Sequence, residues 1–231
     1  MNKALFLDLD GTLIETRSGN TFPKDEKDWK FKSRVLGKIK QFFDQGYKLI
    51  VVTNQAGIDE GYATPLEFNL KVQNINDQIS NFLRVSAGKY HCWQDQTDDV
   101  YWMVADYNEH PWRKPRPDAA FFAADKFNIN LSKSVMVGDA SGLIRLVEFE
   151  YQNCIVVQKN NKPYYRYCPY PGQEELEDYS DKLIKMEDKW MLKKKDFSDS
   201  DKKFAENAGI GTYYDIDEFT KLDLNGIFQS K

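Results

Sequence analysis

Carboxylates and a hydroxyl end three short apolar runs in this 231-residue chain. Asp8 and Asp10 follow the first run, Thr53 ends the second, and Asp139 follows the third. In a doubly wound α/β sheet, ligands bind at the carboxyl ends of the strands, so these groups are expected to meet at one edge. Oxygen ligands of this kind suit Mg²⁺, which binds one or two carboxylates together with substrate phosphate and water.

A lysine between the second and third runs adds a positive charge to this set. Lys114 stands between Arg113 and Pro115, in a segment that is expected to be a loop. Its ammonium group is a point charge that can reach a phosphate. The residue types therefore predict Mg²⁺-assisted chemistry on a phosphate group, although Lys114 taken alone has the sequence features of an ordinary surface lysine.

Alternating apolar runs and helical patterns predict the scaffold that positions these groups. Buried strands are expected over residues 4–9, 47–52 and 135–137, with 154–157 as a candidate fourth strand and one or two more strands within 90–107. Helices are expected from Val35, after a capping box at Thr64–Glu67, and over 119–127. The pattern predicts an α/β fold, a doubly wound (Rossmann-like) parallel sheet with helices on both faces and a minimal cap.

The segment 142–195 interrupts this alternation. Residues 159–172 are rich in Asn, Pro and Tyr and are expected to form an extended loop. An amphipathic helix is expected next, from the spacing of Leu176, Tyr179, Leu183, Met186 and Trp190. We interpret 142–195 as an insertion packed beside the core of a single domain spanning residues 1–231.

The ordered set of motifs resembles the haloacid dehalogenase-like phosphatase superfamily. Asp8-Leu9-Asp10-Gly11-Thr12 matches its first motif, Thr53 its second, Lys114 its third, and Gly138-Asp139 the start of its fourth. The resemblance implies that Asp8 is the nucleophile and Asp10 the general acid and base. It also implies Mg²⁺ held by Asp8, the backbone carbonyl of Asp10 and Asp139, with Thr53 and Lys114 binding the phosphate oxygens.

The fourth motif departs from the usual family pattern. Members commonly place a second acid a few residues after the Gly-Asp pair, whereas Ala140-Ser141-Gly142 follow here. The stretch from Phe197 to Ile210 resembles the continuation of the motif, which makes Asp201 the expected second acid. Asp199 and Asp196 are rivals, and Asp199 has the alternative role of capping the helix that follows.

Longer sequence segments around these motifs are similar to the phosphatase domain of polynucleotide kinase/3′-phosphatases. They are Asp8 to Gly19, Thr53-Asn-Gln-Ala-Gly-Ile58, Arg113-Lys-Pro115, Val137 to Gly142, and Lys195-Asp-Phe-Ser198. The resemblance implies removal of 3′-phosphates from DNA or RNA ends, leaving a 3′-hydroxyl for repair. Arg17, Ser18, Asn54 and Arg113 are the substrate-binding residues implied by the likeness; alternatively Arg17, Ser18 and Arg113 are polar residues of a surface loop.

Two other functions stay open at this point. One is a small-metabolite phosphatase of the same superfamily, and the other is a non-catalytic nucleic-acid end-binding subunit of a repair assembly. The sequence lacks the Gly-x-x-x-x-Gly-Lys-Ser/Thr loop of a kinase, so no 5′-kinase activity is expected and a separate kinase or ligase partner is an additional expectation. Neither DNA versus RNA nor the oligomeric state follows from the sequence.

Composition limits the partners and the compartment. The net charge of −4 excludes a protein that coats nucleic acid along its length. Two segments are nonetheless basic: the stretch between Phe22 and Lys40 has seven basic and three acidic residues, and the stretch between Lys182 and Lys203 has eight lysines and five acids. These segments could steer a polyanion or could be ordinary solvated surface. The three cysteines indicate a reducing, cytoplasmic location (with the nucleus added for a eukaryotic source), and no apolar run approaches the roughly 20 residues of a membrane span.

Overall fold

The computed structural model describes residues 1–19, 23, 25–83, 100–148, 154–159, 162–167, 175–177, 183–186, 189–196 and 198–224. The chain divides into two compact units. The first comprises Met1–Ser141 and Ser198–Lys231, and the second comprises Gly142–Phe197. The second unit coincides closely with the segment 142–195, whose status as an insertion within one domain stays a prediction.

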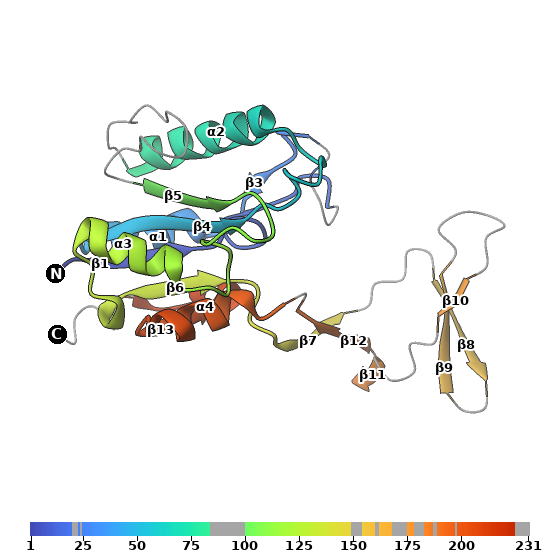
Figure 1. Ribbon diagram of the computed structural model, residues 1–231. Helices are drawn as coiled ribbons and strands as arrows, with labels where there is room; N and C mark the ends of the chain where they lie inside the picture. The colour runs from blue at the N-terminus through green and yellow to red at the C-terminus, as the bar shows by residue number, and fades with distance from the viewer. Residues whose placement is uncertain are drawn as a thin grey trace. The chain divides into compact units, whose positions relative to one another are not determined.

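A five-stranded parallel sheet forms the centre of the first unit (Figure 1). Its strand order is β13-β6-β1-β4-β5. The bounds are β1 Lys3–Leu7, β4 Tyr47–Asn54, β5 Val100–Ala105, β6 Val135–Gly138 and β13 Thr212–Asp215. All four pairings in this sheet are parallel, which confirms the predicted α/β architecture.

Helices cover both faces of this sheet, as predicted. The helices are α1 Val35–Asp44, α2 Pro65–Leu83, α3 Asp118–Phe127, α4 Ser200–Ala208 and α5 Ile216–Phe219, with a 3₁₀ turn at Leu131–Lys133. Alternate residues of β1 point to opposite faces, so Leu5 and Leu7 pack with α1, α2 and α5, whereas Ala4 and Phe6 pack with α3 and α4. Two hydrophobic clusters therefore hold the strand ends in place.

The predicted capping box forms at the start of α2, and a glycine ends α1. Thr64 and Glu67 form a reciprocal capping box, in which the Glu67 carboxylate accepts from Thr64 N at 2.8 Å and Thr64 Oγ1 accepts from Glu67 N at 3.2 Å. Gly46 follows α1 with a φ of 76°, a conformation that favours glycine. No helix in the described part of the chain is long and apolar enough to cross a membrane.

The segment between Gly11 and Val35, for which no strand was predicted, contains a small antiparallel ribbon. Its strands are β2 Ile14–Glu15 and β3 Lys30–Phe31. Strand β13 was also not predicted, whereas β5 falls within the stretch 90–107 that was expected to hold one or two strands. Residues 84–99, which include the first ten residues of that stretch, lie outside the described residues.

The second unit is built from strands, and the helix predicted there is wrong. Its strands are β7 Ile144–Glu148, β8 Cys154–Lys159, β9 Lys162–Tyr167, β10 Glu175–Glu177, β11 Leu183–Met186 and β12 Lys189–Lys195. They form two sheets, ordered β10-β9-β8 and β11-β12-β7. β11 and β12 pair antiparallel with Met186 opposite Lys189, so Leu183, Met186 and Trp190 of the predicted helix belong to a hairpin, whereas Leu176 lies in β10.

Two further expectations for this segment are corrected. Residues 154–157 do lie in a strand, but β8 pairs antiparallel with β9 and does not join the parallel sheet. The predicted extended loop 159–172 contains β9. Both errors have one cause, because β8 and β9 are neighbours in sequence that pair with each other as a hairpin, and the apolar run and the Asn, Pro and Tyr content do not show which strand is the partner.

Candidate active site

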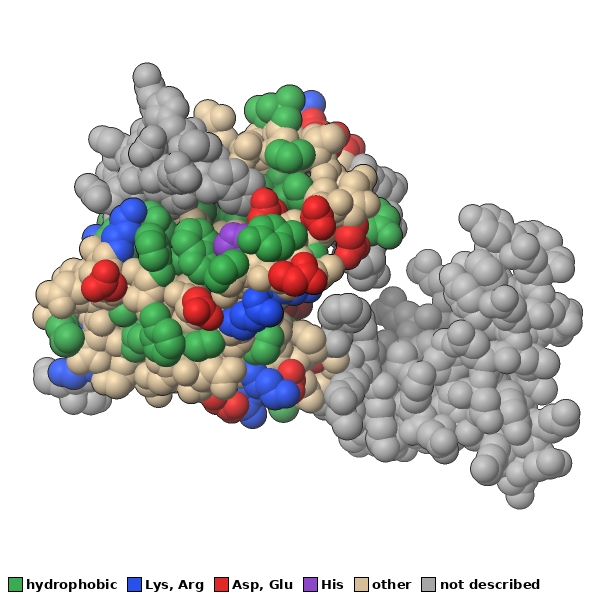
Figure 2. All heavy atoms as spheres, viewed as in Figure 1, with side chains coloured by type: hydrophobic (Ala, Val, Ile, Leu, Met, Phe, Trp, Pro, Cys, Tyr) green, Lys and Arg blue, Asp and Glu red, His purple; other side chains and the backbone are tan. Residues whose placement is uncertain are grey.

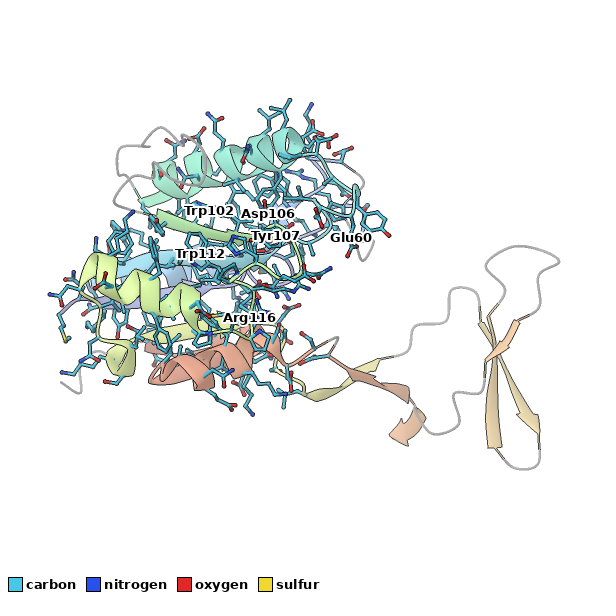
Figure 3. All side chains as sticks on the ribbon, in the orientation of Figure 1. Glu60, Trp102, Asp106, Tyr107, Trp112 and Arg116 are labelled. Atoms are coloured by element: carbon cyan, nitrogen blue, oxygen red, sulfur yellow. The ribbon has the colours of Figure 1, made fainter. Side chains whose placement is uncertain are left out.

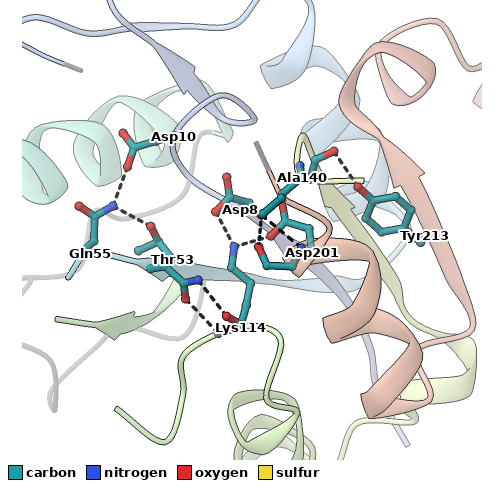
Figure 4. A network of polar contacts seen from close by, with 12 residues as sticks. Asp8, Asp10, Thr53, Gln55, Lys114, Ala140, Asp201 and Tyr213 are labelled. Atoms are coloured by element: carbon teal, nitrogen blue, oxygen red, sulfur yellow. Dashed lines mark hydrogen bonds and ion pairs between the residues drawn. The ribbon is translucent and has the colours of Figure 1, made fainter. Parts of the chain in front are cut away.

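The predicted catalytic groups meet at the carboxyl edge of the parallel sheet (Figure 4). Asp8 directly follows β1, and its N–H donates to the carbonyl of Val137 at 3.0 Å, which continues the β1–β6 ladder. Asp139 directly follows β6, and Thr53 lies near the end of β4. The strand order places β1 between β6 and β4, so Asp8 occupies the middle of the site.

Lys114 joins two of the acids. Its Nζ lies 2.5 Å from Asp8 Oδ1 and 2.7 Å from Asp201 Oδ1. The side chains of Lys114 and Asp201 are each only 2% exposed. A buried ammonium needs partners of opposite charge, and these two carboxylates supply them.

Burial controls the protonation of this cluster. It raises the pKa of Asp8 well above its usual value, against the opposing effect of Lys114. Burial also raises the pKa of Asp139 to about 6, and the neighbouring Asp201 adds to the rise. Burial alone would lower the pKa of Lys114, yet the carboxylates of Asp201 and Asp8 raise it above its ordinary value. The acids outnumber the lysine, so an additional cation would stabilise their ionised forms.

The same acids have the arrangement of a metal site. Asp8, Asp139 and Asp201 each offer a carboxylate oxygen, and these oxygens lie within 4.8 Å of one another. Two glycines leave room for them: a Cβ at Gly11 would lie 2.1 Å from Asp139 Oδ2, and a Cβ at Gly138 would lie 2.3 Å from Asp201 Oδ2. The chemistry and spacing of this donor set fit a hard divalent cation such as Mg²⁺.

Asp10, the predicted acid and base, points to a different set of partners. Its Oδ1 accepts from Nζ of Lys71 at 2.9 Å, and its Oδ2 accepts from Nε2 of Gln55 at 2.6 Å. The same Gln55 nitrogen also donates to Thr53 Oγ1 at 2.8 Å. The carboxylate of Asp10 is therefore held outside the acid cluster, and metal binding by its backbone carbonyl stays a prediction.

Asp201 reaches the site through the backbone around Ala140. The Ala140 carbonyl accepts from the N–H groups of Asp201 and Lys202, and Asp201 Oδ2 accepts from Ala140 N at 3.1 Å. Its rivals lie elsewhere: Asp199 pairs with Lys203 at 2.8 Å, and Asp196 Oδ2 accepts from Leu143 N at 3.1 Å. Of the three acids proposed from the sequence, Asp201 is the one that contacts Lys114.

Asn54 fixes the backbone that carries Lys114. Its Nδ2 donates to the Lys114 carbonyl at 3.0 Å, and its Oδ1 accepts from the Lys114 N–H at 2.9 Å. This two-point contact ties the end of β4 to the loop after β5. The structure thus gives Asn54 a positioning contact, while direct binding of substrate by Asn54 stays a prediction.

Aromatic rings pack against one another along the loop between β5 and Lys114 (Figure 3). The Tyr107 and His110 rings lie 4.9 Å apart, His110 and Trp112 lie 5.4 Å apart, and Trp112 and Phe122 lie 5.3 Å apart. Figure 2 shows hydrophobic side chains beside a histidine on this face, with acidic and basic side chains interspersed. These ring contacts hold the segment that leads into Lys114 against α3.

The remaining predicted substrate residues lie in two places. Arg17 Nε donates to the Trp29 carbonyl at 2.6 Å, and Ser18 donates through N and Oγ to the Asp28 carboxylate. Arg17 and Ser18 line an open hollow of about 370 Å³ with Asp25, Lys27 and Asp28. Arg113 Nη1 is buried without a hydrogen-bond partner among the described residues.

Three residues of the site were not predicted from the sequence. Lys71 and Gln55 hold Asp10, and Lys32 donates to the Gly11 carbonyl at 2.7 Å and lowers the pKa of Asp139, against the effect of burial. One signal pointed to Lys71, which occupies a position on the apolar face of α2 beside Phe68 and Val72. Nothing comparable marks Lys32, which is one of several lysines in a basic stretch.

A family model described as polynucleotide kinase 3 phosphatase matches residues 3–219. The chain belongs to this family. The match spans every site residue described above, including Asp201 beyond the second unit. It confirms the resemblance to the haloacid dehalogenase-like superfamily and to the 3′-phosphatase domain, and it makes this member of the family a phosphatase, a hydrolase.

The relatives of this family member include two kinds of phosphatase. A D-glycero-beta-D-manno-heptose-1,7-bisphosphate 7-phosphatase from Helicobacter pylori (strain J99) is 30% identical over 161 residues, which cover 69% of this chain and 85% of that protein. A bifunctional polynucleotide phosphatase/kinase from Schizosaccharomyces pombe is 36% identical over 78 residues, 33% of this chain and 19% of that protein. Among solved structures, D,D-heptose 1,7-bisphosphate phosphatase from B. bronchiseptica, complexed with magnesium and phosphate, is 18% identical with a TM-score of 0.47 and covers 60% of this chain and 71% of that chain.

Proposed function

We propose that this chain is a Mg²⁺-dependent phosphatase that removes the 3′-phosphate from nucleic-acid ends and leaves a 3′-hydroxyl. The observation that carries the proposal is the match to the polynucleotide kinase 3 phosphatase model over residues 3–219. The site geometry is consistent with it, because a nucleophile, a separate acid and base, and groups for phosphate oxygens lie at one edge of the sheet.

Asp8 and Asp10 divide the chemistry between them. An oxygen of Asp8 attacks phosphorus, the bond from phosphorus to the sugar oxygen breaks, and Asp10 gives a proton to that oxygen. An aspartyl-phosphate on Asp8 results. Water then attacks phosphorus, Asp10 takes a proton from it, and the Asp8 carboxylate is released with inorganic phosphate.

Lys114 and Thr53 would hold the phosphate during both steps. Lys114 already contacts Asp8 at 2.5 Å, so its ammonium lies where negative charge gathers on the transferring group. Thr53 Oγ1 is buried and oriented by Gln55. Asp201 and Asn54 position Lys114, one through its ammonium and the other through its backbone.

The carboxylates of Asp8, Asp139 and Asp201, together with the backbone carbonyl of Asp10, would hold Mg²⁺. When bound, the ion would offset the negative charge of the acids and of the phosphate, which lets anionic Asp8 approach an anionic ester. Lys32 donates a hydrogen bond to the Gly11 carbonyl beside this cluster. Its ammonium group adds to Lys114 a second positive charge near Asp139.

The open hollow beside the ribbon supports a polymer as substrate. Its lining combines the cations Arg17 and Lys27 with Ser18, Asp25 and Asp28, and the Lys27 side chain is 84% exposed. Cations at such a position would meet the backbone phosphates next to a terminal phosphate. Because the sequence contains no kinase phosphate loop, we also propose that a separate kinase or ligase completes the repair of the end.

A second candidate is a sugar-bisphosphate phosphatase. It is favoured by the Helicobacter pylori relative, because the match covers 85% of that protein.

A single assay separates the candidates. It compares phosphate release from a 3′-phosphorylated oligonucleotide, from the same oligonucleotide phosphorylated at its 5′ end, and from a heptose bisphosphate. The proposal expects strong preference for the 3′-phosphate. Preference for the sugar would favour the second candidate, and binding of 3′-phosphorylated ends without turnover would indicate an end-binding subunit.

A further inference from the structure

Lys71 is a buried lysine whose ammonium group faces one acid. It lies on α2 and is 6% exposed, on the face of the helix that also buries Phe68, Val72 and Ile75. Its Nζ lies 2.9 Å from Asp10 Oδ1. Burying a lysine costs free energy unless the ammonium is paired, so a lysine at this position of a helix needs an explanation.

Stability is a weak explanation for this ion pair. The Asp10 side chain is 47% exposed, whereas that of Lys71 is 7% exposed. Water screens a pair with one exposed partner, and such pairs contribute about 0–1 kcal/mol. An apolar residue at position 71 would pack with its neighbours and avoid the cost of burying a charge.

Positioning of Asp10 is the stronger explanation. Lys71 takes one oxygen of the carboxylate and Gln55 takes the other, at 2.9 and 2.6 Å. These donors come from α2 and from the segment after β4, so the half-exposed carboxylate is fixed from two sides. Gln55 also contacts Thr53 Oγ1, which links the orientation of Asp10 to that of a phosphate-binding hydroxyl (Figure 4).

We infer that Lys71 is a positioning residue that orients the Asp10 carboxylate for proton transfer to the leaving group. The inference rests on the part of the proposed function that makes Asp10 the acid and base, and it is independent of the preference for nucleic acid. Proton transfer depends steeply on the placement of the donor, so loss of Lys71 is expected to slow the step in which Asp10 acts as acid.

The leaving group supplies the test. Thymidine 3′-monophosphate releases a poor alcohol leaving group that needs a proton, whereas p-nitrophenyl phosphate releases a phenolate that does not. We expect Lys71→Met to slow single-turnover release of thymidine about 10- to 100-fold, and to change the burst of p-nitrophenolate less than about threefold. Lys71→Gln, which keeps a donor without the charge, serves as the second variant if the methionine variant does not fold.

A control lysine and a double-mutant cycle complete the experiment. Lys126→Met removes a lysine that contacts the Tyr101 hydroxyl at 3.1 Å, away from Asp10, and is expected to leave both rates unchanged. In an Asp10→Asn background, Lys71→Met is expected to have no further effect, because its role passes through Asp10. Equal slowing of both substrates, or a full additional loss in the Asp10→Asn background, would overturn the inference.

Both substrates are small, so the outcome separates this inference from the preference for polymers. If the unaltered chain hydrolyses both small esters and ignores 3′-phosphorylated oligonucleotides, the proposed function fails and the Lys71 test still applies. If oligonucleotides are hydrolysed and Lys71→Met slows both small esters alike, the Lys71 inference alone fails.

Discussion

Asp201 Oδ1 lies 2.7 Å from Lys114 Nζ, although the whole second unit, Gly142–Phe197, separates Asp201 from Asp139 in the sequence. Backbone hydrogen bonds from Asp201 and Lys202 to the Ala140 carbonyl return the chain to the site. The fourth motif of this family member is therefore divided in sequence and joined in space. Mutation of Asp201 therefore tests whether an acid so far along the sequence from Asp139 contributes to the site.

Asp201→Asn is expected to lower turnover by about 10- to 100-fold, because the amide keeps an acceptor for Ala140 N but loses the charge that orients Lys114 and completes the acid cluster. Steady-state phosphate release measures the effect. Asp199→Asn is the matched control, since Asp199 forms an exposed pair with Lys203 and its loss should leave turnover unchanged. Full activity of Asp201→Asn would remove this residue from the site.

Asp8→Asn is expected to abolish turnover, because a neutral amide is a poor nucleophile and a poor ligand for a divalent cation. In the unaltered protein, acid quenching during turnover of a ³²P-labelled substrate should trap label on the chain, and hydroxylamine should release it as expected for an acyl phosphate. The Asp8→Asn variant should trap none. Substantial dephosphorylation by that variant would contradict the covalent mechanism.

The core of the site could be predicted from the sequence because its residues directly follow apolar strands. Asp8, Thr53 and Asp139 each stand at a strand end, where local hydrophobicity and parallel topology together decide position. Lys114 carries no such local mark, and only its order among the motifs pointed to it. The parallel sheet and the helices on both faces were predictable for the same reason.

What could not be predicted depends on contacts between distant segments. The apolar spacing over 176–190 fits a helix, yet Leu183, Met186 and Trp190 lie in the paired strands β11 and β12, and β12 also pairs with the distant β7. Lys71 stood out only as a charge on an apolar helix face, and its partner Asp10 lies 61 residues away. Periodicity describes one element at a time, so it identifies neither the strand partner nor the ion pair.

Mg²⁺ is expected to stabilise the protein more at higher pH. Without metal, the raised pKa of Asp139 means that the folded state binds a proton more tightly than the unfolded state between its ordinary value of 3.8 and about 6. Stability should therefore fall as pH rises through this window and stay lower above it. Metal binding needs ionised carboxylates, so the increase in Tm caused by Mg²⁺ should be large above about pH 7 and fade as pH falls below about 6.

Thermal unfolding with Mg²⁺ and with a chelator, at several pH values, measures this dependence. Asp139→Asn should remove most of the Mg²⁺ effect and flatten the pH dependence of the metal-free protein. Phosphatase activity that survives the chelator, or a Tm that rises equally with Mg²⁺ at every pH, would contradict the assignment of Asp139 to the metal.

Salt should weaken binding of oligonucleotides more than turnover of a small ester. Contacts with backbone phosphates release counterions, so the logarithm of the affinity should fall linearly with the logarithm of the salt concentration. p-Nitrophenyl phosphate reaches only the catalytic groups and should respond much less. Lys27→Ala should reduce the slope by about one, because Lys27 lines the hollow beside Arg17 and its contact with Glu26 is long, at 3.8 Å. Lys40→Ala should not, because Lys40 lies outside the hollow residues and pairs with Asp44 at 2.8 Å. Equal salt responses of the two substrates would show that the basic segment between Phe22 and Lys40 does not contact the oligonucleotide.

Asn54→Ala is expected to reduce turnover through its effect on Lys114, although the substitution removes no charge. It removes both hydrogen bonds between the Asn54 amide and the Lys114 backbone, which should cost about 1–3 kcal/mol of stability and release the loop that carries the lysine. Ser134→Ala is the matched control. It also removes two hydrogen bonds, to Ala4 N and the Asn130 carbonyl, but at the amino ends of β1 and β6, opposite the edge of the sheet that carries the site. Both variants should lose similar stability, and only Asn54→Ala should lose turnover well beyond that. Equal turnover of the two variants, measured below their unfolding temperatures, would show that the contact serves folding alone.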